Sequence, residues 1–105
     1  MNYKIHVSHA AEHDLHSAAN YIAHQLQNPL AARRMLTNAL ASIDSLETFP
    51  GREPLLASHQ LHFVPVQNYF LFYRIDSSTQ TVHILRFLYG HSDWQAILRA
   101  DVLPT

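Results

Sequence analysis

The sequence predicts a single α+β domain whose elements follow the order β-α-α-β-β-β-α. Three observations support this class. Apolar residues recur at steps of three and four through the first half of the chain, three runs rich in β-branched and aromatic residues occupy the second half, and short polar turns separate those runs. The 105 residues and 48% hydrophobic content suit one domain, 1–105, with one modest core. We therefore expect an antiparallel meander sheet packed by an N-terminal helical hairpin, with a short C-terminal helix.

The N-terminal half is expected to form one strand and two antiparallel helices. Residues 3–7 alternate as a half-buried strand, and Ser8 then supplies an N-cap oxygen. The first helix is predicted over residues 9–27. The second begins at Pro29, is capped by Asn28, and ends near residue 49, where a Pro-Gly pair disfavours continuation. The expected core faces are Ala11, Leu15, Ala18, Ile22 and Leu26 in the first helix, and Ala32, Met35, Leu36, Ala39, Ile43 and Leu46 in the second.

The C-terminal half is expected to form a three-stranded meander after a loop over residues 51–60. The predicted strands cover residues 61–66, 69–75 and 81–89. The short polar links between them are typical of neighbouring antiparallel strands. After a corner at Gly90, a last helix is predicted with Ser92 as its N-cap and Asp93 in its first turn. The helices are expected to cover one face of the sheet and to leave the other face partly open.

Strict alternation divides the last predicted strand into two faces. One face would carry Val82, Ile84, Arg86 and Leu88, and the other His83, Leu85, Phe87 and Tyr89. Arg86 stands in an apolar run, so it needs a carboxylate partner or an anionic ligand. The carboxylates considered for such a pair are Glu53, Asp76 and Asp93.

Composition excludes several classes of site. The chain has no cysteine, which excludes disulfides and cysteine-bearing metal sites and fits a reducing compartment. No apolar run approaches the roughly 18 residues of a membrane span, and the N-terminus lacks a signal-peptide pattern, so we expect a cytoplasmic protein. Motifs for nucleotide hydrolysis, metalloproteolysis and serine hydrolysis are absent. His9, His13 and His16 have helical ligand spacing, but no acidic or cysteine ligand completes a set, so neither a metal nor a cofactor is expected.

The charge balance does not indicate a nucleic-acid binder. Seven Lys and Arg residues stand against eight Asp and Glu, and Lys4 is the single lysine. The nine histidines would add positive charge in mild acid, because histidine changes its charge between about pH 5 and 8. Any affinity for RNA is therefore expected to rise as the pH falls.

A set of histidines and arginines around the meander suits RNA cleavage without a metal. Such cleavage needs a base for the 2′-hydroxyl, an acid for the leaving 5′-oxygen, and cations for the extra phosphate charge. The candidates are His62, Arg74, His83, Arg86 and His91, with Tyr73, Tyr89 and Trp94 nearby to stack a base. Each also has a structural alternative: a polar corner for His91, an ion pair for Arg86, surface charge for Arg74, an ordinary strand histidine for His62, and a core anchor for Trp94.

The segments VPVQNYFLFYRID and TVHILRFLYGHSDWQAIL together resemble the C-terminal half of the RelE/ParE superfamily of toxins from bacterial type II toxin-antitoxin modules. The shared pattern is apolar-V-x-x-Y-x-x-x-Y, a polar turn, and V-x-I-x-R-apolar-x-H/Y-G-x-x-D-W. The resemblance extends over nearly the whole chain through the first strand, the helix with Asp14-Leu15, the Asn-Pro joint and the second helix ending in L-x-x-F-P-G.

The resemblance implies a compact toxin that is neutralised by a cognate antitoxin, with operator DNA bound through the antitoxin. RelE-like members cut mRNA on the ribosome, and ParE-like members block DNA gyrase. We expect a ribosome-dependent mRNA endoribonuclease. The alternatives are a non-catalytic gyrase inhibitor and a decayed toxin that only binds its antitoxin.

For an endoribonuclease, the resemblance also implies a set of site residues. The expected catalytic residues are His91, Arg86 and His62, and the expected substrate-binding residues are Arg74, Arg52 and Trp94. His91 would act as general acid or base, Arg86 would steady the phosphate, and His62 would be the complementary proton carrier. Many relatives have arginine at the position of His62, and their basic loop is reduced here to Arg52. This shortage of permanent cations is expected to weaken a grip on ribosomal RNA.

Overall fold

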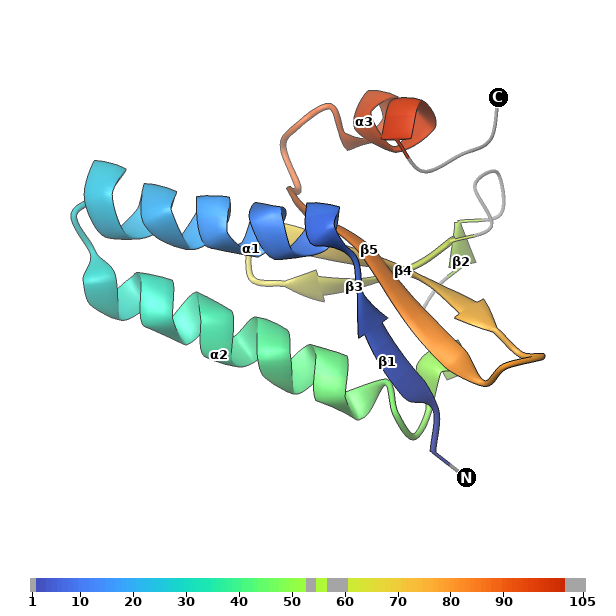
Figure 1. Cartoon of the computed structure of the whole chain (residues 1–105). Helices are drawn as coiled ribbons and strands as arrows, with labels where there is room; N and C mark the ends of the chain where they lie inside the picture. Colours follow the sequence, from blue (N-terminus) through green and yellow to red (C-terminus); the bar gives the residue numbers. More distant parts are fainter. Residues whose placement is uncertain (1, 53–54, 57–60, 102–105) are drawn as a thin grey trace.

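The fold is one mixed sheet with helices on both faces (Figure 1). The computed structural model describes residues 2–52, 55–56 and 61–101. The strands lie in the order β1-β5-β4-β3-β2. They are β1 (Lys4–Val7), β2 (Leu55–Leu56), β3 (Leu61–Val66), β4 (Tyr69–Asp76) and β5 (Thr81–Tyr89), and the helices are α1 (His9–Asn20), α2 (Pro29–Ser45) and α3 (Trp94–Asp101). The predicted α+β class and the β3-β4-β5 meander are confirmed, while β1 adds a parallel pairing along β5.

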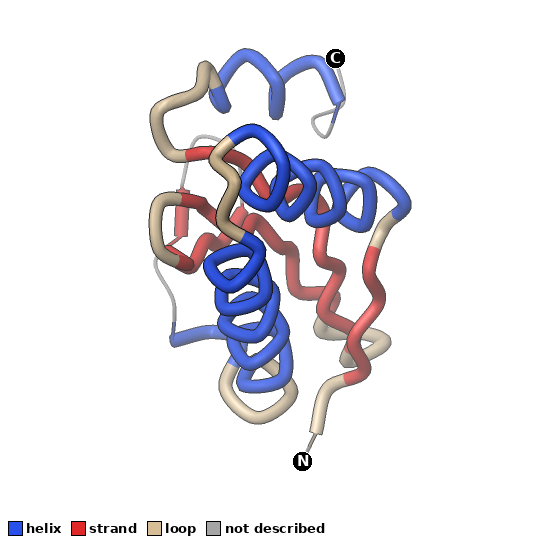
Figure 2. Tube along the Cα trace, turned by 90° about the vertical axis from the view of Figure 1, so that its left-hand side faces the viewer, coloured by secondary structure: helices blue, strands red, loops and turns tan. Residues whose placement is uncertain are grey.

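α1 and α2 form the predicted antiparallel hairpin, which Figure 2 shows from the end where the two helices are joined. The Ser8 hydroxyl accepts the N–H of Ala11 at 3.0 Å and donates to the carbonyl of Leu85 at 3.0 Å, so the helix start is tied to β5. The Asn28 side chain accepts the N–H of Ala31 at 3.1 Å at the start of α2. Both predicted N-caps are confirmed, and each satisfies a backbone donor that the helix leaves free.

Both helices of the hairpin end earlier than predicted. α1 passes at Tyr21 into a π-helical turn, Tyr21–Gln25, and Gln27 then takes a positive φ of 52° before α2 begins. α2 ends at Ser45, and turns over residues 46–48 follow it. The apolar period continues through both segments, so the period alone did not reveal the change in backbone hydrogen bonding.

The segment predicted as a loop over residues 51–60 contains the short edge strand β2. Leu55 pairs with His62 and Leu56 with Leu61 in antiparallel register. The loop prediction is therefore wrong at these positions, because a two-residue strand is too short to show a period in sequence. Residues 53–54 and 57–60 lie outside the described part of the chain.

Two hydrophobic clusters lie on opposite faces of the sheet. The first lies under the hairpin and joins Ala11, Leu15 and Met35 to sheet residues such as Leu71 and Val82. The second lies under α3 and is formed by Leu61, Phe72, Leu88 and Leu98, with Trp94 packed against it. The expectation that the helices cover a single face is therefore wrong, since α3 covers part of the face opposite the hairpin.

A β-bulge interrupts the alternation of β5. Tyr73 pairs with Ile84, whereas the preceding Phe72 pairs with Arg86, so Leu85 is the additional residue on β5. Beyond the bulge, Phe87 joins the cluster under the hairpin and Leu88 joins the cluster under α3. The predicted division of this strand into two faces holds through Leu85 and is wrong after it, because the extra residue moves Phe87 and Leu88 to the faces opposite those predicted.

The last helix is capped by Asp93 instead of Ser92. The Asp93 carboxylate accepts the N–H of Ala96 at 3.5 Å, and its carbonyl accepts the N–H of Ile97 at 3.2 Å. The Ser92 hydroxyl donates to the carbonyl of Tyr89 and so helps to close the corner after β5. The helix begins one residue later than predicted. Among the described residues, no helix has the length and apolar character that crossing a membrane requires.

Candidate functional site

Arg86 is bound by a carboxylate from α1. Its Nε lies 2.7 Å from Oδ2 of Asp14, and its Nη2 lies 2.9 Å from Oδ1. Oδ2 also accepts the backbone N–H of Phe87 at 3.0 Å. The two side chains are only 14% and 10% exposed, so this is a largely buried, bidentate pair. The sequence correctly predicted that Arg86 needs an anionic partner, but Asp14 was not among the carboxylates considered.

Asp14 reaches this position because β1 is shorter than β5. β1 pairs with β5 only as far as Ile84, so the edge of β5 is free of β1 from Leu85 onward. Ser8 and Asp14, at the start and in the middle of α1, bond to Leu85 and Phe87 along this edge. A sequence signal for Asp14 existed, since it lies three residues after buried Ala11 and four before buried Ala18 on the inner side of α1.

His91 lies on an exposed corner beyond β5. The preceding Gly90 donates its N–H to the carbonyl of Asn68 at 2.7 Å, and a Cβ on Gly90 would lie 3.1 Å from that same oxygen. Gly90 therefore allows β5 to approach the β3–β4 turn closely. The ring of His91 lies 5.3 Å from the ring of Tyr89, and the side chain faces solvent.

His62 lies far from His91. Its ring stacks on Tyr73 with centroids 5.3 Å apart, and Tyr73 in turn pairs with Ile84 across the sheet. Tyr89 pairs with Tyr69, and Tyr69 and Tyr73 are four residues apart on β4, which at about 3.3 Å per residue separates the levels of His62 and Tyr89 by about 13 Å. His91 lies beyond Tyr89, so the structure does not bring the two predicted proton carriers together.

The expected substrate-binding residues are also dispersed. Trp94 packs its ring 5.9 Å from Phe70 and 5.3 Å from Phe72, within the cluster under α3. Arg74 is exposed on β4, directly opposite His83 of β5. Arg52 ends the 3-10 turn Pro50–Arg52, and its side chain lies outside the described part of the structure.

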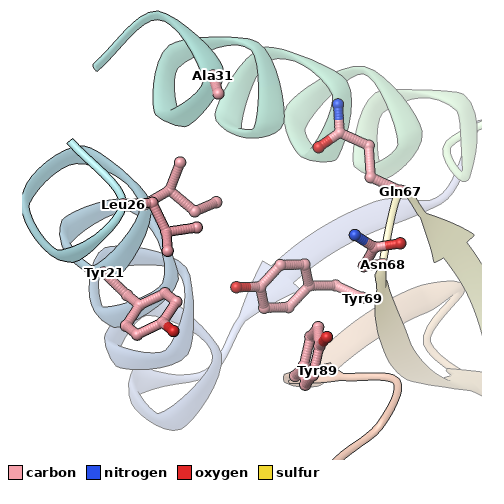
Figure 3. Close-up of a pocket in the computed structure, with 8 residues that line it drawn as sticks. Tyr21, Leu26, Ala31, Gln67, Asn68, Tyr69 and Tyr89 are labelled. Atoms are coloured by element: carbon pink, nitrogen blue, oxygen red, sulfur yellow. The ribbon is translucent and has the colours of Figure 1, made fainter. Parts of the chain in front are cut away.

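A pocket lies between the end of the hairpin and the sheet (Figure 3). It has a volume of about 670 Å³, within the range typical of ligand sites. It is lined by Tyr21, Ile22, Leu26, Ala31, Gln67, Asn68, Tyr69 and Tyr89. None of these side chains carries a charge at neutral pH, so the pocket suits an apolar group that also accepts or donates hydrogen bonds. We call it the tyrosine pocket.

The tyrosine pocket changes the pKa of one of the tyrosines that line it. Burial raises the pKa of Tyr69, and the nearby Tyr89 and Tyr21 raise it further. The Tyr69 ring stacks on Phe87 with centroids 4.9 Å apart, which fixes its direction. In Figure 3 its hydroxyl points toward the end of the hairpin, near Leu26. Sequence reasoning missed this pocket, because its walls come from several separate segments: the π-helical turn, the start of α2, the turn between β3 and β4, the first residue of β4 and the last residue of β5.

Apolar side chains are exposed at the end of the hairpin beside this pocket. Tyr21 is 53% exposed, Leu26 is 56% exposed and Leu30 is 55% exposed. We call these three residues the hairpin tip. Large apolar side chains that gather around a pocket are typical of a surface that binds a protein partner.

Within the described ranges, no group of three or more His, Cys, Asp or Glu side chains is arranged to hold a metal ion. His9 lies 4.0 Å from the carboxylate of Glu12, one turn along α1. His9, His13 and His16 are all exposed on α1.

Comparison with known proteins identifies the family. The model for the ParE toxin of the type II toxin-antitoxin system parDE matches residues 5–94. The chain belongs to the ParE toxin family. The match extends from the first strand to the start of α3, so it includes the hairpin, the whole meander and the corner at Gly90. A search of curated proteins gives no match.

Solved structures share the fold of this ParE-family chain. The chromosomal ParDE toxin-antitoxin system from P. aeruginosa aligns with a TM-score of 0.69 at 13% identity, over 83% of this chain and 95% of that chain. The RelBE2 toxin-antitoxin complex from Mycobacterium tuberculosis aligns with a TM-score of 0.60 at 24% identity, over 85% and 99%. The archaeal RelE-RelB complex from Pyrococcus horikoshii OT3 aligns with a TM-score of 0.62 at 16% identity, over 87% and 98%. These similarities establish the RelE/ParE fold.

Proposed function

We propose that this ParE-family toxin inhibits DNA gyrase by binding it, without a catalytic step of its own. The observation that carries the proposal is the exposed apolar hairpin tip beside the tyrosine pocket. A non-catalytic inhibitor needs a surface that can bury apolar area against its target. Tyrosine is among the residues that contribute most to such interfaces.

The positions of the other candidate residues also support a non-catalytic mode. Acid, base and phosphate-binding groups must converge within hydrogen-bond reach of one scissile bond. His62 and His91 lie at distant levels of the sheet, and two donors of Arg86 are bound to Asp14. Trp94 serves the core under α3. A catalytic arrangement of these residues would require the sheet and α1 to rearrange.

The proposed toxin also requires a partner that keeps it inactive. We infer a cognate antitoxin, because the chain belongs to a toxin family and its structural neighbours were solved as toxin-antitoxin complexes. The antitoxin would also supply the contact with operator DNA, and both proteins would act in the cytoplasm. Copurification of a small protein encoded beside this gene would test the partner. If expression of this protein alone did not harm the cell, the inferred need for an inhibiting antitoxin would be contradicted.

Ribosome-dependent mRNA cleavage is the second candidate function. One observation favours it: His91 is exposed and lies at the same end of the sheet as Tyr89, a pocket residue that can stack a base. A site built around this pair would have to operate without His62. Mapping of mRNA 5′ ends after induction would reveal ribosome-phased cuts if this candidate is right.

Two leucines of α2 provide a matched test of the gyrase proposal. Leu30 lies in the hairpin tip and Leu40 lies farther along α2, and both are 55% exposed. Ten residues separate them, which is about 15 Å along the helix. We expect wild-type protein and Leu40→Ala to inhibit supercoiling by purified gyrase, and Leu30→Ala to need at least about a tenfold higher concentration, as for a moderate interface residue. Gyrase that is unaffected by excess wild-type protein would reject the proposal.

A further inference from the structure

A row of basic side chains crosses three strands at the end of the sheet away from α3. His6 of β1 pairs with His83 of β5, and His83 pairs with Arg74 of β4. Residues that pair directly across strands carry their side chains on the same face of a sheet. Ile5 and Val7 pack under the hairpin, so His6 between them points to the opposite face, and the row lies there. Figure 1 shows β1 and β5 side by side at this end of the sheet, below α3.

The three side chains of this row are close together and accessible. The rings of His6 and His83 meet edge to face, with centroids 5.5 Å apart and planes at 67°. His6 and Arg74 are exposed, and His83 is half-buried. In the described part of the chain, none of the three side chains forms a hydrogen bond or an ion pair with another residue. Their donors are therefore available to a ligand.

The charges around the row favour an anion. Lys4 lies two residues before His6 on the same face of β1. Asp76, two residues after Arg74, is the one carboxylate on this part of β4, and its Oδ1 is engaged by Ser78 and Thr79 in the following turn. Two imidazoles this close can also hold a transition metal, but Lys4 and Arg74 flank the pair with positive charge, and no carboxylate among the described residues completes a ligand set.

The length of the row indicates the kind of anion. Neighbouring strands lie about 4.8 Å apart, so His6 and Arg74 are separated by about 10 Å across two strand spacings. A single phosphate is too small to reach both ends. We propose that His6, His83 and Arg74 form a binding row for the phosphate backbone of a nucleic-acid strand, and that the row binds when its two imidazoles are protonated.

This site is separate from the tyrosine pocket and does not depend on the gyrase proposal. It gives a location to the pH-dependent nucleic-acid affinity that the histidine-rich composition predicts. Protonated imidazoles repel each other across strands, and a bound phosphate offsets that repulsion. Binding of an anion to protonated imidazoles is linked to proton uptake, so the affinity falls as the pH rises.

The test is the salt dependence of binding to a short fluorescent single-stranded oligonucleotide, measured by anisotropy at about pH 6 and about pH 7.5. Each neutralised phosphate of a single strand contributes about −0.7 to the slope of log affinity against log salt. We expect a slope of about −2 at the lower pH, because the row makes three phosphate contacts. The double variant His6→Gln/His83→Gln removes two of them, so its slope should be less negative by about 1.4. The same variant should lose most of the difference in affinity between the two pH values.

The control is the double variant His13→Gln/His16→Gln, which removes two exposed histidines of α1 and leaves the row intact. It should bind like the wild type, and thermal melts should show that both double variants are folded. Equal binding at the two pH values, or an equal loss in both double variants, would overturn the proposal. The proposal would also be overturned if inorganic phosphate competed for the site as strongly as an unlabelled oligonucleotide at the same concentration of phosphate groups. A rise in melting temperature with Zn²⁺ that requires His6 and His83 would identify a metal site instead and would also overturn it.

Discussion

Asp14 holds the guanidinium of Arg86 with both carboxylate oxygens, although the two residues are 72 positions apart in the chain. The pair fastens α1 to the part of β5 that β1 leaves uncovered. Its third contact, from the N–H of Phe87, satisfies a backbone donor at an otherwise open strand edge. The pair therefore serves the packing of the hairpin on the sheet.

Removing one member of this pair should be costly. Asp14→Ala removes the carboxylate that accepts from two donors of the mostly buried Arg86 and from the backbone N–H of Phe87, so we expect a loss of about 3 kcal/mol in the free energy of unfolding. Arg86→Met added to Asp14→Ala should recover part of that loss, because it removes the buried charge that has lost the Asp14 carboxylate. Urea unfolding of the two single variants and the double variant measures both effects. A loss below about 0.5 kcal/mol in Asp14→Ala would mean that the pair adds no stability.

The turn after β4 predicts a stability change in acid. The hydrogen bond from the Ser78 hydroxyl, 2.7 Å long, is the main cause that lowers the pKa of Asp76 below 3.8, and bonds from Thr79 add to it. A lowered folded-state pKa stabilises the fold above the unfolded value, and the contribution is lost as the pH falls through the folded value. Asp76→Ala should therefore melt below wild type at neutral pH, and the two curves should converge below pH 3.8. Ser77→Ala is the control, and a difference that persists in strong acid would contradict this origin.

The sequence predicted most of the fold because its elements are marked locally. The caps at Ser8 and Asn28 and the meander strands depend on residues close in sequence, and all were placed correctly. The Asp14–Arg86 pair, the bulge at Leu85 and the tyrosine pocket depend on the relative positions of distant segments. No spacing rule within one element reports them. Residue type correctly indicated that Arg86 needs an anion, but only the packing of α1 on β5 determined which one.

The phenol of Tyr69 should ionise late in an alkaline titration. Its pKa is raised above 10.0, first by burial and then by Tyr89 and Tyr21, so the protonated form stabilises the fold below pH 10.0 and this contribution is lost as the pH rises through the folded-state pKa. Absorbance titration should show a late component that Tyr69→Phe removes and that Tyr3→Phe retains. The Tyr69→Phe protein should also lose less stability than wild type above pH 10.0. A wild-type titration without a late component would show that the pocket does not desolvate this ring.

His91→Ala separates the two candidate functions in one experiment. The side chain is exposed, and its ring lies 5.3 Å from the ring of Tyr89, so its removal should change the free energy of unfolding by less than about 0.5 kcal/mol. If the toxin acts by binding gyrase through the hairpin tip, induced expression of His91→Ala should arrest growth as strongly as wild type, without new mRNA 5′ ends. Leu30→Ala, expressed to the same level, should be weaker. Arrest that requires His91, accompanied by ribosome-phased cuts in the wild type alone, would instead make the corner after β5 catalytic and reject the gyrase mechanism.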